Sequence, residues 1–189
     1  MRVPGAVAVF GSSEPVPGDP LYRQAYDVGR ALAAAGHTVV TGGYGGVMEG
    51  ASRGAVEAGG HTVGVTCGIF DLRPPNPYLR ERVTTADLHD RTRELIRRSK
   101  AFVVLEGKAG TLAELTFLWA LARAGCLDGS PVILLGARWS RLIRLLEQDG
   151  WLERSQLETT HLVDDPQAAV KRIERTTHGG PVTNQAETE

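Results

Sequence analysis

Two glycine-rich turns carry the residues best suited to chemistry in this sequence. Residues 42–46 read Gly-Gly-Tyr-Gly-Gly and residues 106–111 read Glu-Gly-Lys-Ala-Gly-Thr, each soon after a short apolar run. Glycines let the backbone approach a ligand closely, and a helix that follows such a turn begins with unpaired amides at the positive end of its dipole. One turn of this kind is explained equally well by a tight strand-to-helix connection. Two together predict a site for a phosphate or a nucleotide.

Neither turn matches a common nucleotide-binding motif. The sequence has no GxxxxGK[ST] spacing, and no GxGxxG turn with an acidic residue at the end of the next strand. A P-loop kinase and a dinucleotide-dependent dehydrogenase are therefore disfavoured. The two cysteines, Cys67 and Cys126, have no CxxC or CxxxH neighbour, so neither a disulfide framework nor a zinc site is indicated. We expect no metal and no cofactor.

Arg91 falls on the apolar face of the helix that we expect over residues 88–99. It lies three residues after Leu88 and four before Leu95, which places it on the same face as both. A guanidinium at a core-facing position needs an anionic partner, because leaving it dry and unpaired costs several kcal/mol. The partner could be a ligand. The alternative is that Arg91 lies at the edge of the apolar face and extends to solvent.

Glu114 follows the second glycine-rich turn. Thr111 and Glu114 have the spacing of a capping box, in which Thr111 is the N-cap and Glu114 bonds back to it. A structural role is therefore one interpretation. The other is catalytic, because a carboxylate at the mouth of a phosphate-binding turn could stabilise a developing cation or orient water.

An alternation of apolar runs and helical patterns predicts the fold that positions these residues. Short apolar runs are typical of strands buried on both faces of a sheet, and strands alternating with helices imply right-handed crossovers. We expect a doubly wound α/β fold, a parallel sheet with helices on both faces, whose ligand site lies at the carboxyl ends of the strands. The expected strands are at 6–10, 39–40, 62–65, 101–105 and 132–135, and the expected helices are at 20–35, 46–58, 88–99, 111–124, 138–146 and 167–175.

The chain of 189 residues is expected to form a single domain over residues 1–175. Residues 176–189 have almost no apolar content, and we expect them to be a disordered tail. Residues 67–77 contain three prolines and are expected to form an exposed loop that could cover a pocket.

The charge balance narrows the classes of partner. Lys and Arg number 21 against 22 Asp and Glu, a net charge of -1, so we expect neither nucleic-acid nor membrane-surface binding. We expect no signal peptide, and no apolar run approaches the roughly 20 residues that span a bilayer. We expect a cytoplasmic protein with a small-molecule partner.

Three segments together resemble the LONELY GUY (LOG) family and its wider Rossmann-like superfamily, long labelled lysine decarboxylases. Residues 42–49, 88–91 and 107–114 are similar to that family's GGGxxGxM turn, MHxRK helix start and PGGxGTxxE turn, in the family's order. The resemblance covers roughly residues 6–135. It implies a phosphoribohydrolase, which cleaves the N-glycosidic bond of a nucleoside 5′-monophosphate such as AMP or a cytokinin nucleotide into free base and ribose 5-phosphate. It also implies a homodimer built on helices near the site.

Carried over residue by residue, the resemblance assigns catalysis to Arg91 and Glu114. Glu114 would stabilise positive charge on the ribose C1′ and position water, and Arg91 would anchor the ligand and hold Glu114 ionised. The residues expected to bind the substrate and its phosphate are Gly11, Ser12, Gly42, Gly43, Gly45, Gly46, Met48, Gly107, Lys108, Gly110 and Thr111.

The chain departs from the family signatures in both turns. Tyr44 replaces a glycine of the first, and Glu106 and Lys108 replace the proline and second glycine of the other. Glu106 would repel a phosphate and Lys108 would add a cation beside it. These departures leave open an alternative, a non-catalytic binder or carrier of a nucleotide or of molybdenum cofactor. A lysine decarboxylase is the weakest alternative, because it needs a Schiff-base lysine and the chain has few lysines.

Overall fold

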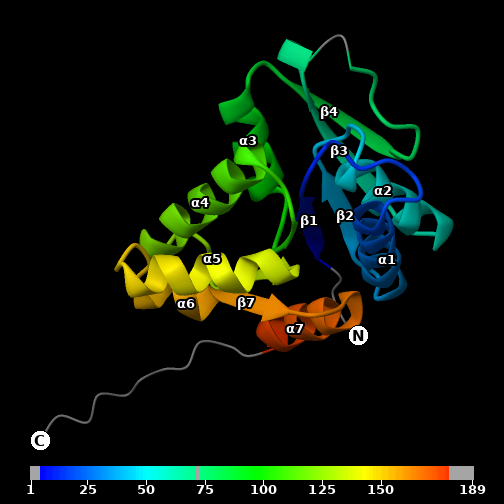
Figure 1. Ribbon diagram of the computed structural model, residues 1–189. Helices are drawn as coiled ribbons and strands as arrows, with labels where there is room; N and C mark the ends of the chain where they lie inside the picture. Colours follow the sequence, from blue (N-terminus) through cyan, green and yellow to red (C-terminus); the bar gives the residue numbers. More distant parts are fainter. Residues whose placement is uncertain (1–4, 71–72, 179–189) are drawn as a thin grey trace, which may run out of the picture.

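The computed structural model describes residues 5–70 and 73–178 and contains one seven-stranded parallel sheet (Figure 1). Its strand order is β4-β3-β2-β1-β5-β6-β7. The chain runs outward from β1 to β4 and then returns to β5 on the other side of β1, so the order reverses between β1 and β5. The doubly wound α/β prediction is confirmed. The strands are β1 (Ala6–Phe10), β2 (Thr38–Thr41), β3 (Thr62–Cys67), β4 (Glu81–Thr85), β5 (Ala101–Leu105), β6 (Val132–Leu135) and β7 (Thr160–Val163).

Helices cover both faces of the sheet (Figure 1). Alternate residues of each central strand point to opposite faces: Val7 and Val9 of β1 pack in one core, and Ala8 and Phe10 in the other. The first core is closed by α1 (Pro20–Ala34), α2 (Val47–Glu57) and α7 (Pro166–His178). The second is closed by α3 (Leu88–Arg97), α4 (Ala109–Arg123), α5 (Ala137–Gln148) and α6 (Arg154–Thr159).

The sequence pattern missed both edge strands and α6. β4 and β7 have mostly part-buried or exposed residues, because an edge strand covers less of the core, so neither has the continuous apolar run that marks the central strands. The expected loop at 67–77 is corrected at its start, since Cys67 ends β3 and Gly68–Phe70 form a 3-10 turn. Residues 71–72 lie outside the described part of the chain, and residues 73–77 form a loop in which Asn76 is buried. Helix α7 reaches His178, so the first residues of the expected tail are helical, and residues 179–189 lie outside the described part of the chain.

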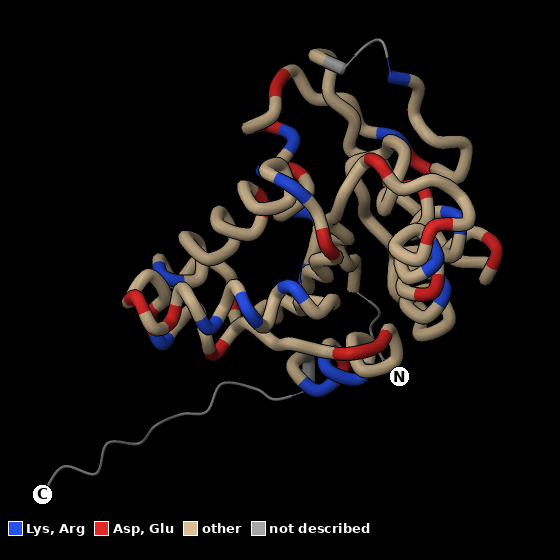
Figure 2. Tube along the Cα trace, viewed as in Figure 1, with Lys and Arg blue, Asp and Glu red and all other residues tan. Residues whose placement is uncertain are grey.

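Charged residues of both signs are spread along the helices on both faces of the sheet (Figure 2). In the described residues, no helix is long and apolar enough to cross a bilayer. Cys67 is a buried free thiol and Cys126 an exposed one.

Helices α1 and α2 approach each other unusually closely. A Cβ placed on Gly54 of α2 would lie 2.0 Å from the Tyr26 carbonyl oxygen, and one on Gly29 of α1 would lie 1.9 Å from the Ala51 carbonyl oxygen. Backbone cannot move aside as the end of a flexible side chain can. The glycines therefore let α2 lie directly beside α1, and this packing fixes the helix that follows the first glycine-rich turn.

We expect Gly54→Ala to destabilise the fold, because its methyl group would overlap the backbone of α1. Helix propensity alone predicts the opposite effect on stability, because alanine stabilises an unhindered helix by about 1 kcal/mol relative to glycine. The measurement is the urea midpoint of unfolding. A midpoint equal to or above that of the wild type would show that the two helices have room to separate.

Candidate active site

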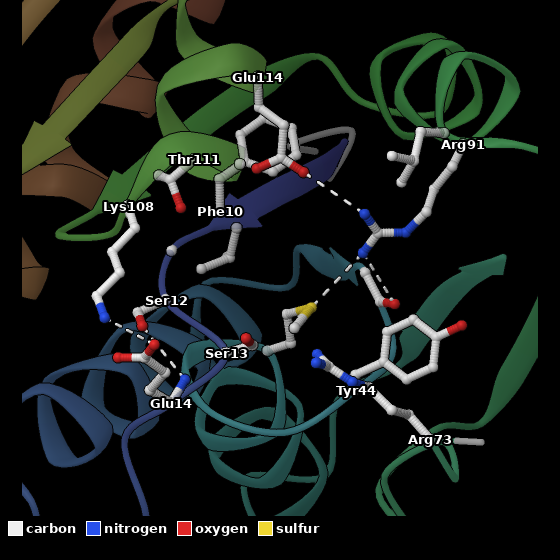
Figure 3. Close-up of a pocket in the computed structure, with 16 residues that line it drawn as sticks. Phe10, Ser12, Ser13, Glu14, Tyr44, Arg73, Arg91, Lys108, Thr111 and Glu114 are labelled. Carbon is white, nitrogen blue, oxygen red and sulfur yellow. Dashed lines mark hydrogen bonds and ion pairs between the residues drawn. The ribbon is translucent and has the colours of Figure 1, made fainter. Parts of the chain in front are cut away.

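A cavity of about 260 Å³ opens at the carboxyl ends of the central strands (Figure 3). Its walls come from the end of β1, the turns after β1 and β2, the first turn of α4, and α3. The strand order reverses between β1 and β5, and in an open parallel sheet the crevice at that point is where ligands bind. Topology thus brings together turns that are far apart in the sequence.

Arg91 is buried in the wall of this cavity and contacts several elements. Its Nε donates to the Val65 carbonyl at 2.9 Å, and its Nη2 donates to the Gly42 carbonyl at 3.1 Å. Nη2 also lies 3.6 Å from the Met48 sulfur, and Nη1 lies 3.8 Å from Oε1 of Glu114. The side chain of Arg91 is only 10% exposed, so it does not extend to solvent. The guanidinium ties together β3, the first glycine-rich turn, α2 and α4.

Gly42 leaves the space that Arg91 fills. A Cβ at Gly42 would lie 1.6 Å from Nη2 of Arg91, so no other residue fits there without displacing the guanidinium. The Tyr44 ring lies beneath the same group, with its centroid 5.8 Å from the guanidinium carbon. Its hydroxyl donates to the Cys67 carbonyl at 3.0 Å and accepts from the Cys67 amide at 2.9 Å. Tyr44 therefore packs the turn against β3 where the family signature has a glycine.

The start of α4 differs from the predicted capping box. The helix begins at Ala109, its N-cap is Lys108, and no side chain caps it. Thr111 is thus the third helical residue, and Glu114 lies one turn too far along to bond back to the N-cap. The first backbone bond of the helix runs from the Leu112 amide to the Lys108 carbonyl at 3.0 Å. Amides that precede it have no acceptor within the helix, and the carboxylate of Glu114 is free to face Arg91.

Glu114 lies deep in the cavity, with its side chain 15% exposed. Burial raises the pKa of this carboxyl to about 7, and the positive charge of Arg91 lowers it only in part. The expectation that the charge of Arg91 holds Glu114 ionised is corrected, because desolvation raises the pKa by more than the ion pair at 3.8 Å lowers it. Near neutral pH Glu114 exchanges readily between the acid and the carboxylate.

Glu106 is turned away from this cavity. Its Oε1 accepts from the Arg138 amide at 3.2 Å, near the start of α5, and its Oε2 lies 3.3 Å from the Arg138 Nε. Gly136 makes room for it, since a Cβ there would lie 2.7 Å from the Glu106 Cγ. The carboxylate thus faces the positive end of α5 and is paired with Arg138, which weakens the expected repulsion of a phosphate. Lys108 pairs with Glu14, Nζ to Oε1 at 2.8 Å, across the cavity mouth.

The cavity gathers only part of the expected set. Gly43, Gly45, Gly46 and Gly107 do not line it. Gly46 instead shapes the chain, since it has a φ of 72° and a Cβ there would lie 2.4 Å from the Ser12 carbonyl oxygen. The expected residues that do line the cavity are Gly11, Ser12, Gly42, Met48, Arg91, Lys108, Gly110, Thr111 and Glu114.

Sequence reasoning missed several lining residues. Ser13 and Glu14 directly follow Ser12, and Tyr44 lies inside the first glycine-rich turn. Their places in the sequence were therefore enough to predict that they lie near the site. Arg73 lies in the proline-rich segment 67–77, which the sequence predicted as a loop that could cover a pocket, but no local pattern singled out Arg73 itself. The missed lining residues are Val9, Phe10, Ser13, Glu14, Tyr44, Arg73 and Leu88.

Fold and cavity together define a doubly wound α/β protein with a cavity at the point where its strand order reverses. Within the described residues, no group of three or more His, Cys, Asp or Glu side chains is placed to hold a metal ion. The chain belongs to the SLOG cluster4 family, whose model matches residues 5–169.

Curated relatives confirm the resemblance to the LOG family. The chain is 32% identical over 167 residues to a cytokinin riboside 5′-monophosphate phosphoribohydrolase of Mycobacterium marinum, covering 84% of this chain and 88% of that one. It is 31% identical over 142 residues to an Arabidopsis thaliana protein of the same name, covering 72% and 62%.

Solved structures share the fold. The X-ray structure of the structural-genomics target TM1055 is 34% identical, with a TM-score of 0.74, and the match covers 90% of this chain and 99% of that one. The molybdenum cofactor binding protein of Rippkaea orientalis is 22% identical, with a TM-score of 0.73, covering 94% and 99%. At that identity the second likeness shows the fold alone.

The raised pKa of Glu114 links stability to pH. The folded protein keeps this proton up to about pH 7, whereas the unfolded chain releases it near 4.5. Between these values the unfolded state holds fewer protons, so the free energy of unfolding falls as pH rises, by up to about 3 kcal/mol. We expect the melting temperature of the wild type to fall relative to that of Glu114→Gln between roughly pH 5 and pH 8.

The control is Glu147→Gln on α5, where the side chain is exposed. Its melting temperature should follow that of the wild type across the same range. A constant difference between the wild type and Glu114→Gln would show that Glu114 titrates as it does in the unfolded chain.

Proposed function

We propose that the protein hydrolyses the N-glycosidic bond of a nucleoside 5′-monophosphate, of the AMP or cytokinin nucleotide type, to free base and ribose 5-phosphate. The observation that carries this proposal is the pair of Arg91 and Glu114 inside the cavity, 3.8 Å apart at their nearest charged atoms. Both occupy the positions of the family's signature arginine and glutamate. Relatives at 31–32% identity are named as phosphoribohydrolases, which supports the same reaction here.

The 5′-phosphate would bind at the start of α4. The amides before Leu112 have no acceptor within the helix, and the dipole there favours an anion. Gly110 has no atom within 4 Å of where a Cβ would stand, so the backbone is open to a ligand at that point. The ammonium of Lys108 lies at the same end of the cavity, where a phosphate could take the place of Glu14 as its partner.

The reaction adds water to the ribose C1′ and breaks its bond to the base nitrogen, which leaves with the electron pair and takes up a proton. Positive charge builds on C1′ and the ring oxygen as this bond breaks. The carboxylate of Glu114 would stabilise that charge and orient the attacking water. Arg91, with three other acceptors within reach, holds the wall of the cavity and lowers the pKa of Glu114 against the effect of burial.

A non-catalytic binder of a nucleotide or of molybdenum cofactor is the alternative. Glu106 and Lys108 favour it, because they stand where the family signature has proline and glycine. The structure weakens one argument for it, since Glu106 is directed to α5 and not to the phosphate site. A binder would gain stability from its ligand by mass action and release no base.

We further propose that the protein is a homodimer built on α4. This helix carries apolar side chains on its solvent face, with Leu112 38% and Phe117 45% exposed. A helix that is apolar on all sides is typical of one buried on all sides. The face begins beside the cavity mouth, so a second copy packed there would shield the site from water.

Base release tests the reaction. We expect the wild type to release free base from nucleoside 5′-monophosphates, and Glu114→Gln and Arg91→Ala to reduce kcat/KM on the order of 100-fold or more, since a group aimed at developing charge is worth that much. The rate should rise with pH through about 7, because the carboxylate of Glu114 is the active form. Chromatography of the base is the measurement.

Glu147→Gln serves again as the control and should retain the wild-type rate. Base release that survives both cavity substitutions would contradict the assigned roles. No release from any nucleotide, together with a rise of melting temperature on adding one, would favour the binder.

Sedimentation tests the dimer. We expect the wild type to sediment at twice its chain mass of 20.3 kDa, and Phe117→Glu to sediment as a monomer, because a buried carboxylate opposes apolar packing. Leu145→Glu on α5 is the matched control, since Leu145 is also exposed but lies on another helix. A monomeric wild type would rule out this interface.

A further inference from the structure

Glu14 pairs with Lys108 across the mouth of the cavity. Its Oε1 lies 2.8 Å from the Lys108 Nζ, although the two residues are 94 positions apart in the sequence (Figure 3). Both side chains line the cavity and both are mostly exposed, Glu14 by 63% and Lys108 by 75%. An exposed ion pair of this kind contributes little to stability, so another anion can displace the carboxylate at small cost.

The backbone holds both residues of this pair in place. The Glu14 amide donates to the Ser12 hydroxyl at 3.2 Å, and the Ser12 amide donates to the Glu106 carbonyl at 3.1 Å. These bonds join the turn after β1 to the turn before α4. Lys108 is the N-cap of α4, and its carbonyl accepts from the Leu112 amide. The turn after β1 therefore presents a carboxylate to the residue from which α4 begins.

The same end of the cavity carries a buried hydroxyl that is suited to a phosphate. Thr111 is 4% exposed and lines the cavity, and Figure 3 shows its hydroxyl directed into it. Among the described residues, no group is hydrogen-bonded to this hydroxyl, which can donate to a phosphate oxygen. Thr111, Lys108 and the amides at the start of α4 thus favour a phosphate beside the position where Glu14 supplies the negative charge.

A second cavity, of about 430 Å³, opens on the other side of the ion pair. Ser12, Glu14 and Lys108 line both cavities, so the pair forms part of the wall between them. Arg138 lines the second cavity and brings a cation to that side. When a phosphate binds Lys108, the carboxylate of Glu14 therefore has solvated space to turn into.

Substrate and product of the proposed reaction carry the same phosphate. A lysine beside that group strengthens the binding of both, which lowers KM without raising kcat and slows the release of ribose 5-phosphate. The family signature has glycine where this chain has Lys108. We propose that Glu14 is an internal anion that competes with the phosphate of the ligand for Lys108, and so weakens the binding of phosphorylated ligands. The inference rests on the proposed function for the place of the phosphate.

The test measures dissociation constants by calorimetry, with ribose 5-phosphate and adenosine as the ligands. We expect Glu14→Gln to bind ribose 5-phosphate about two- to fivefold more tightly than the wild type does, the factor that an exposed ion pair contributes to an equilibrium constant. Adenosine has no phosphate, so its affinity should be the same for both proteins. An equal gain for adenosine would overturn the inference, because competition for Lys108 affects only phosphorylated ligands.

Two further variants separate competition for Lys108 from a general effect of charge. Asp19→Asn removes the same charge from a residue that lines the second cavity but does not pair with Lys108, and it should bind ribose 5-phosphate as the wild type does. In a Lys108→Gln background, Glu14→Gln should give a smaller gain, since no ammonium is left to compete for. A gain in Asp19→Asn equal to that of Glu14→Gln, or the full gain without Lys108, would overturn the competition.

Failure of this inference and failure of the proposed function have different signatures, because binding is measured without hydrolysis. Base release from AMP, with equal affinities of the wild type and Glu14→Gln for ribose 5-phosphate, overturns the competition and leaves the reaction standing. No base release, with tighter binding of ribose 5-phosphate by Glu14→Gln, overturns the reaction and upholds the competition. Ribose 5-phosphate that binds neither protein overturns the phosphate site and the competition with it.

Discussion

The buried guanidinium of Arg91 connects four of the elements around the cavity. A charge removed from water must be surrounded by acceptors, and here they come from β3, from the turn after β2, from α2 and from α4. Those acceptors are correctly placed only when the neighbouring elements are. Gly42 is subject to the same constraint, because any side chain at that position would occupy the space of the guanidinium. Arg91 thus acts as the centre of the site whatever reaction the site performs.

The positive charge of the same guanidinium lowers the pKa of Glu114, but burial of the carboxyl raises that pKa by more. At 3.8 Å its attraction offsets only part of the cost of burying a carboxylate, so the pKa of Glu114 stays raised, at about 7. A glycosidic hydrolysis benefits from such a group, because a carboxylate in a dry site stabilises a developing cation more strongly than one in water. The cost appears as a fold that is less stable when Glu114 is ionised.

The departures from the family signatures have structural explanations. Glu106 faces the start of α5, and its carboxylate there takes the place of a capping side chain, while Tyr44 fills space against β3 and packs under Arg91. Lys108 is paired with Glu14 at the mouth. Tyr44 and Lys108 both line the cavity, so these two substitutions change its wall, whereas Glu106 does not line it.

The sequence by itself determined the central sheet, the position of the two turns, and Arg91 as a core-facing charge. These follow from local pattern: apolar runs identify buried strands, and helical spacing places Arg91 on the face of Leu95. The edge strands β4 and β7 were not predicted, because their residues are part-buried or exposed and form no continuous apolar run. Only the tertiary structure decided where α4 begins, that Glu106 faces α5, and that Arg73 reaches the site. Each depends on groups distant in sequence, such as the Arg138 amide for Glu106 and the Gly43 carbonyl for the segment of Arg73, and no local pattern encodes contacts of that kind.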